Sequence, residues 1–191
     1  MDDKGKPENS FIPKHGGYKK LLTYQKAEII YDGTVYFCKK FLKKPDRTID
    51  QMIQAARSGK QNIAEASMAS ATSKEMEIKL TNVARASLEE LLLDYQDFLR
   101  TRGFKEWGKD HKYVNRLREL NRTPNANYET FKKGIENHNP EISANVLIGL
   151  IKITSYLLSR QIKRLEEDFI KEGGLREKMT KARINYRNKG Q

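Results

Sequence analysis

The feature that most constrains the fold is the spacing of apolar residues, which recur every three or four positions through four long segments. This spacing places them along one face of an α-helix, which makes a turn about every 3.6 residues. The first segment covers residues 18–44 and stops at Pro45, which cannot continue a helix. No segment requires the alternating pattern of a half-buried strand. The sequence therefore predicts an all-α protein.

The second and third helices have clear start signals. Asp46 is placed to cap the second helix, whose inward seam contains small residues such as Gly59. A glycine inside a helix costs about 1 kcal/mol relative to alanine, so we interpret Gly59 as a point of close helix packing. The sequence Thr72-Ser73-Lys74-Glu75 fits a capping box at the start of the third helix, and Gly103 is its expected stop.

The fourth long helix follows a longer connection. Residues 104–139 are broken by glycine, proline and asparagine, and we expect an excursion with one short helix over 110–122. Asn139-Pro140-Glu141 then supplies an N-cap, a proline at the first helical position and an acid in the first turn. This helix is expected to stop at Gly173-Gly174. The pattern predicts an up-down four-helix bundle over residues 18–172.

The charge of the chain suggests a polyanionic partner. Lys and Arg number 37 against 25 Asp and Glu, a formal net charge of +12, which affects association and not fold. The tail over residues 173–191 has six Lys and Arg but one acid, and is expected to be either a basic amphipathic extension or a disordered arm. Residues 1–17 are expected to form a flexible N-terminal segment.

The first set of candidate nucleic-acid contacts lies in the tail. Tyr186 sits between Arg183 and Arg187, which combines a stacking surface with cations, as proteins that bind single-stranded nucleic acid do. The alternative is an arm that only improves solubility.

The second set lies on the second and third helices. Its members are Arg57, Lys60, Lys74, Lys79 and Arg85. Together they could form a basic face that neutralises phosphates and releases counterions. The alternative is an ordinary solvated helix face.

A polar pair is expected near the seam of the second helix. Asn62 and Glu65 are three residues apart, so they share a face beside apolar neighbours. We interpret them as a structural polar network that fixes helix register, rather than as ligand contacts, because a buried carboxylate needs a partner.

Signals for catalysis, cofactors and membranes are lacking in the sequence. It has no glycine-rich phosphate loop, GxSxG elbow or HExxH motif, and its single Cys38 lies on an apolar stripe. The three histidines are far apart, so we expect no metal site and no cofactor. Neither a signal peptide nor about 20 consecutive apolar residues occurs. We expect a cytoplasmic protein that is not an enzyme and has no membrane partner.

Residues of the second and third helices also match a known signature. They are Gln51, Ala55-Ala56, Ser58, Asn62-Ile63-Ala64-Glu65, Ser73-Lys74-Glu75 and Ala86-Ser87-Leu88-Glu89-Glu90-Leu91. These residues resemble the bacterial four-helix bundle family first noticed as proteins encoded in intervening sequences of large-subunit ribosomal RNA genes. The long third connection and the C-terminal part resemble a longer subfamily with a four-helix bundle suffix domain. The chain departs from the family at Ala66, usually glycine, and at residues 57–60, which replace a more apolar stretch containing proline.

The resemblance implies a function without catalysis. Relatives in that family form ring-shaped homopentamers, and one is the basic accessory protein that works with reverse transcriptase in diversity-generating retroelements. What this implies here is a homo-oligomer, a pentamer by resemblance, that assists a process involving RNA or DNA. The rival hypothesis is a protein-protein interaction scaffold whose basic charge is incidental.

Overall fold

The computed structural model describes residues 17–43 and 45–189, and every regular element in these two ranges is a helix. A short 3-10 helix precedes seven α-helices. They are η1 (Tyr18–Lys20), α1 (Leu22–Phe41), α2 (Arg47–Ala69), α3 (Lys74–Thr101), α4 (Lys112–Arg122), α5 (Tyr128–Ile135), α6 (Pro140–Glu172) and α7 (Leu175–Lys189). The predicted all-α class is confirmed. The predicted N-terminal segment, except Gly17, and the predicted helix end at residue 44 lie outside the described residues.

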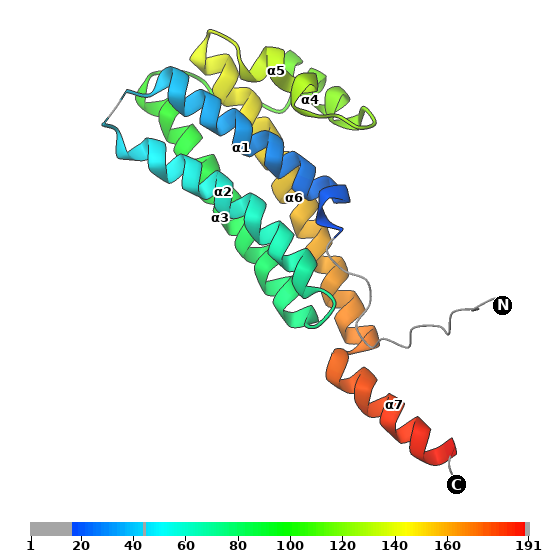
Figure 1. Cartoon of the computed structure of the whole chain (residues 1–191). Coiled ribbons are helices and arrows are strands. Elements are labelled where there is room, and N and C mark those ends of the chain that lie inside the picture. Colours follow the sequence, from blue (N-terminus) through cyan, green and yellow to red (C-terminus); the bar gives the residue numbers. More distant parts are fainter. Residues whose placement is uncertain (1–16, 44, 190–191) are drawn as a thin grey trace, which may run out of the picture.

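The four longest helices pack on one another along their length. Helix α1 contacts α2 and α6, α2 contacts α3, and α3 contacts α6. Figure 1 shows them side by side, with α4 and α5 against one side of this group and α7 pointing away from it. Helices α4 and α5 both contact α6, and α5 also contacts α1. The excursion therefore covers part of the outer surface of α1 and α6.

The centre of the core is aromatic. Tyr95 of α3 is fully buried, and its hydroxyl donates a hydrogen bond of 3.1 Å to Thr34 Oγ1 of α1. The Phe37 ring meets the rings of Tyr95 and Phe98 edge to face, with centroid separations of 4.9 and 4.8 Å. This arrangement is the favourable one for aromatic pairs, because a positive ring edge meets a negative ring face. The contacts join α1 and α3 across the core.

Close helix packing occurs at Gly59, as the sequence predicts. A Cβ atom placed there would lie 2.8 Å from Leu88 Cδ2 of α3. Ala84 and Leu88, both buried, form the opposing surface on α3. The lack of a side chain at Gly59 is therefore what allows α2 and α3 to approach here.

Two of the predicted helix starts are confirmed by their caps. Asp46 Oδ1 accepts a hydrogen bond of 2.9 Å from the backbone N–H of Thr48 at the start of α2. Asn139 Oδ1 accepts one of 2.9 Å from the N–H of Glu141, and Pro140 is the first residue of α6. Both caps satisfy N–H groups that have no partner within the helix.

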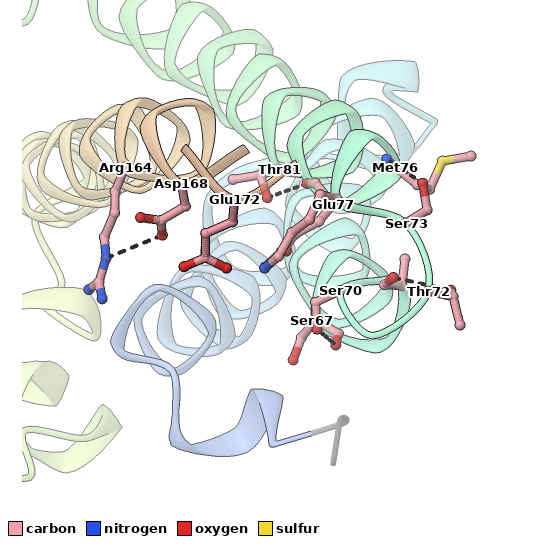
Figure 2. Close-up of polar contacts among 12 residues, drawn as sticks. Ser67, Ser70, Thr72, Ser73, Met76, Glu77, Thr81, Arg164, Asp168 and Glu172 are labelled. Atoms are coloured by element: carbon pink, nitrogen blue, oxygen red, sulfur yellow. Dashed lines mark hydrogen bonds and ion pairs between the residues drawn. The ribbon is translucent and has the colours of Figure 1, made fainter. Parts of the chain in front are cut away.

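The predicted capping box at the start of α3 is wrong in detail. Ser73 is the N-cap, and its Oγ accepts a hydrogen bond of 3.1 Å from the N–H of Met76 (Figure 2). The Thr72 hydroxyl instead donates to the carbonyl of Ala69, behind the helix start. Glu75 pairs with Lys79 rather than reaching back to the cap. The helix therefore begins one residue later than a box from Thr72 to Glu75 requires.

Removal of the Ser73 hydroxyl tests this assignment. We expect Ser73→Ala to lower the free energy of unfolding by about 1 kcal/mol, because the N–H of Met76 loses its partner. Urea denaturation at neutral pH measures the change. Thr72→Ala is the matched control and is expected to have the smaller effect. A larger loss from Thr72→Ala would show that the cap is assigned to the wrong residue.

The connection between α3 and α6 contains one expected and one unexpected helix. Helix α4 matches the short helix predicted over 110–122, whereas no helix was predicted where α5 lies. Asn127 Oδ1 accepts from the N–H of Thr130, and Thr130 Oγ1 accepts from the N–H of Asn127, so a reciprocal capping box starts α5. The helix was not predicted because Gly134 suggested a break in this part of the sequence. The spacing of Asn127 and Thr130, which fits a capping box, could have predicted its start.

The basic tail is helical. Helix α6 ends at Glu172. The next residue, Gly173, has a φ of 70° in the region that favours glycine, and α7 begins two residues after it. Of the two expectations for the tail, the described residues match the helical extension and not the disordered arm. Residues 190–191 lie outside them.

Candidate nucleic-acid interface

The basic residues predicted on α3 are largely neutralised by acids. Lys74 Nζ lies 2.8 Å from Glu77 Oε2, and Lys79 Nζ lies 2.6 Å from Glu75 Oε1. Glu172 at the end of α6 also lies at this end of α3 (Figure 2). Lys178 lowers the pKa of the Glu172 carboxyl by hydrogen bond and charge, and the charge of Lys74 lowers it further. These lysines therefore have anionic partners within the protein.

The predicted basic face of α2 and α3 is not assembled as one patch. Lys60 Nζ lies 4.3 Å from the centre of the Tyr31 ring, so this side chain points toward α1. Lys74 instead lies beside α6. Arg57 is exposed, while Arg85 is half-buried and donates from Nη2 to Asn82 Oδ1 at 2.9 Å. Helices α2 and α3 together carry seven Lys and Arg but eight Asp and Glu.

The predicted polar network includes Asn62 but not Glu65. Asn62 Nδ2 donates to the carbonyl of Ser58 at 2.9 Å and to Ser58 Oγ at 3.1 Å. Ser58 Oγ and Ser87 Oγ are 3.0 Å apart, which links α2 to α3. Glu65 is exposed, because three residues along a helix still turn its side chain by about 60° from that of Asn62. The network is thus formed by Ser58, Asn62 and Ser87.

Helix α7 carries the predicted tail site in an accessible position. Tyr186 is 82% exposed, and Arg183 and Arg187 on either side of it are exposed as well. No α7 residue whose side chain the structure describes is buried. Figure 1 shows this helix pointing away from the other helices. An ion pair of 2.9 Å between Lys178 and Glu172 ties its first turn to the end of α6.

The arginines of α7 form a row that the site prediction missed in part. Arg176, Arg183 and Arg187 are separated by seven and four residues, so at about 100° per residue they fall within about 40° of one another. The predicted site omitted Arg176, although its spacing of seven residues from Arg183 places both on the same face of a helix. Lys178 and Lys181 lie on the opposite flank of the helix. Between the flanks runs an apolar seam of Leu175, Met179, Ala182 and Tyr186.

The side chains with nucleophilic or metal-binding potential form no reactive site in the described residues. Cys38 is buried, and this burial raises the pKa of its thiol to about 12, with smaller contributions from the charges of Asp94 and Asp46. The thiolate needed for nucleophilic chemistry is therefore scarce at neutral pH. Within residues 17–43 and 45–189, no group of three or more His, Cys, Asp or Glu is placed to hold a metal ion.

Helix α6 begins a stretch that is apolar enough to cross a membrane by length and composition. Most of its apolar window is buried inside the protein. Leu147, Leu150 and Ile151 of this helix are fully buried in the core. A helix packed in a protein core passes the same test, so this feature does not by itself indicate a membrane partner.

Neither protein-family models, nor curated proteins, nor solved structures gave a significant match. A function for this protein therefore has to be inferred from the geometry and charge of its own residues.

Proposed function

We propose that this chain is a non-catalytic, homo-oligomeric protein of the cytoplasm that binds RNA or DNA and acts as an accessory factor. The observation that carries the proposal is α7, a projecting helix with six Lys and Arg against one acid and an exposed tyrosine among its arginines. The basic charge of α7 is accessible, whereas the lysines at the start of α3 are paired with acids. The proposed contacts are thus Arg176, Arg183, Tyr186 and Arg187.

We also propose that α1, α2, α3 and α6 constitute an up-down four-helix bundle of the ribosomal RNA intervening-sequence type, with α7 in the suffix domain. Support comes from the contacts of α1 with α2 and α6 and of α3 with α2 and α6. The long connection before α6 and the small residue Gly59 at the α2–α3 contact agree with this proposal.

The chemistry of α7 suits a nucleic-acid backbone. Each arginine that meets a phosphate releases a condensed counterion, which favours binding most strongly at low salt. An exposed tyrosine ring provides a stacking surface that any base can use, so binding of this kind is tolerant of sequence.

A protein-protein scaffold is the second candidate function. The observation that favours it is a set of large apolar side chains exposed outside the core. Leu93 is 62% exposed and Ile170 is 82% exposed. Isolated exposed apolar residues are common, but apolar residues gathered with complementary charge can bind a protein.

The salt dependence of binding tests the proposed function. Affinity for a generic single-stranded RNA or DNA is expected to fall linearly on a log-log plot against salt, with a slope of about −0.7 per phosphate contacted. Replacing Arg176, Arg183 and Arg187 by glutamine is expected to flatten that slope by about 2. The matched variant, which removes the same charge from Arg57, Lys60 and Arg85, is expected to leave the slope close to that of the wild type. Fluorescence anisotropy at several salt concentrations provides the measurement.

The controls separate binding from folding. All three replaced arginines of α7 are exposed, so helicity by circular dichroism should be preserved. Deletion of residues 173–191 is expected to weaken binding more than the triple substitution, because it removes Tyr186 and the lysines as well. If the intact protein retains neither RNA nor DNA at low salt, the nucleic-acid proposal fails and the scaffold replaces it.

A further inference from the structure

The outer face of α3 combines exposed apolar side chains with acids. Val83 is 45% exposed and Leu93 is 62% exposed. Ala86, Glu89, Glu90 and Asp97 are exposed on the same side of the helix, at spacings that keep them on one face. Between Ala86 and Leu99 the helix has four acids and no Lys or Arg. We call the six residues Val83, Ala86, Glu89, Glu90, Leu93 and Asp97 the acidic seam.

The carboxylates of this region are poorly compensated by cations. Asp97 pairs with Arg100 at 2.7 Å, but neither Glu89 nor Glu90 has an ion-pair partner among the described residues. Burial raises the pKa of the neighbouring Asp94, and the negative charges of Asp97 and Glu90 raise it further. A cation brought to this face would therefore relieve repulsion between like charges.

Helix α7 has the complementary pattern. Leu175, Met179, Ala182 and Tyr186 recur at spacings of four, three and four residues, as in the seam of a coiled coil. Basic residues flank that seam on both sides, in the positions where charged residues of a coiled coil pair with those of a partner helix. A helix of about 15 residues is marginal in water by itself, so a surface that covers its apolar seam would stabilise it.

We propose that the acidic seam of α3 is the docking surface for α7 of a second copy of this chain. The lengths agree, because α7 extends for about 22 Å and the seam from Val83 to Asp97 for about 21 Å at 1.5 Å per residue. Apolar residues would meet along the centre and arginines would meet glutamates along the edges. The inference deepens the homo-oligomeric part of the proposed function and does not depend on the nucleic-acid part.

The helix of the same copy cannot reach the far part of this surface. The charge of Lys74, the first residue of α3, lowers the pKa of the Glu172 carboxyl at the end of α6, so these two residues are close together. Helix α7 follows α6 directly and therefore begins beside the start of α3. Asp97 lies about 35 Å farther along α3, whereas α7 is about 22 Å long. A second copy is thus needed to occupy the far part of the acidic seam.

The proposed contact is heterologous, since it joins two different surfaces of the same chain. Such a contact closes into a ring or continues as an open filament, depending on the rotation between copies. The arginines of α7 would serve both the acidic seam and nucleic acid. Added polyanion is therefore expected to compete with self-association.

Charge reversal in two separate chains tests the pairing. One variant carries Glu89→Lys, Glu90→Lys and Asp97→Lys, and the other carries Arg176→Glu, Arg183→Glu and Arg187→Glu. For each full-length variant alone, the dissociation constant of self-association is expected to rise about tenfold or more, because like charges then face each other. An equimolar mixture is expected to recover association above the mass of one chain, because each α7 meets an α3 of opposite charge wherever the two variants alternate. A closed ring of five is not expected from the mixture, since an odd ring keeps one contact between like copies. Light scattering of nuclease-treated protein at micromolar concentration measures the mass against 22.2 kDa for one chain.

The outcomes separate this inference from the proposed function. A wild-type protein that stays monomeric overturns both the homo-oligomer and the docking surface. If the wild type associates but the α3 variant associates equally well, or the mixture does not recover, the oligomer uses another surface and the inference alone is wrong. Nucleic-acid binding should persist in the α3 variant, which keeps α7 intact. All six substituted residues are exposed, and circular dichroism checks that each variant remains folded.

Discussion

Replacement of Tyr95 by alanine is expected to lower the free energy of unfolding by about 3–5 kcal/mol, the range for removing a large aromatic side chain from a packed core. Tyr95 is fully buried, and its ring lies 4.9 Å from that of Phe37, centroid to centroid. The substitution removes this contact and leaves a cavity between α1 and α3. Chemical denaturation monitored by circular dichroism gives the change directly.

Tyr95→Phe is the control that separates the ring from its hydroxyl. It removes only the hydrogen bond of 3.1 Å to Thr34 Oγ1 and is expected to cost about 1 kcal/mol. The Thr34 hydroxyl keeps its own bond of 2.7 Å to the carbonyl of Ile30, so no buried donor is left without a partner. Equal losses from the two substitutions would mean that the ring contributes little to the core and that its assigned place there is wrong.

Gly59→Leu is expected to lower the free energy of unfolding by about 3 kcal/mol through overpacking. A Cβ atom alone would lie 2.8 Å from Leu88 Cδ2, and leucine adds three further carbons at this α2–α3 contact. Leucine is favoured over glycine inside a helix by about 1 kcal/mol, which offsets only part of the overpacking. Thermal unfolding of both proteins measures the difference.

Gly108→Leu is the matched control for Gly59→Leu. A Cβ atom at Gly108 would have no neighbour within 4 Å, so the same side chain is expected to fit there with little change in stability. Coincident melting curves for the wild type and Gly59→Leu would contradict the close approach of α2 and α3. A large loss from Gly108→Leu would mean that the connection after α3 is packed more tightly than described.

The locations of the long helices could be predicted from the sequence because their signals are local. A cap such as Asp46 bonds to a backbone group two residues away, and Asn139 does the same. Apolar spacing and the glycine stops at Gly103 and Gly173 likewise depend on neighbours along the chain. The sequence also predicted that Gly59 marks a close contact, since an interior glycine has few other uses in a helix.

The partners of charged and polar side chains were decided by the tertiary structure. Five basic residues on α2 and α3 suggested one face, but Lys60 points toward α1 while Lys74 lies beside acids of α3 and α6. Glu65 shares a helix with Asn62 yet faces solvent, because α2 packs on α3 along the edge that carries Ser58 and not along the edge that carries Glu65.

The sequence by itself determined the all-α class, the long helices and the concentration of basic charge in the tail, since composition and helical period are properties of the chain alone. Which charges are free and which are neutralised was decided only by folding, because electrostatic pairing depends on distances between helices that the sequence does not contain. Helix α7 illustrates both the part that the sequence determines and the part that the tertiary structure decides. Its charge is visible in the sequence, while its projection away from the other helices is a property of the tertiary structure (Figure 1).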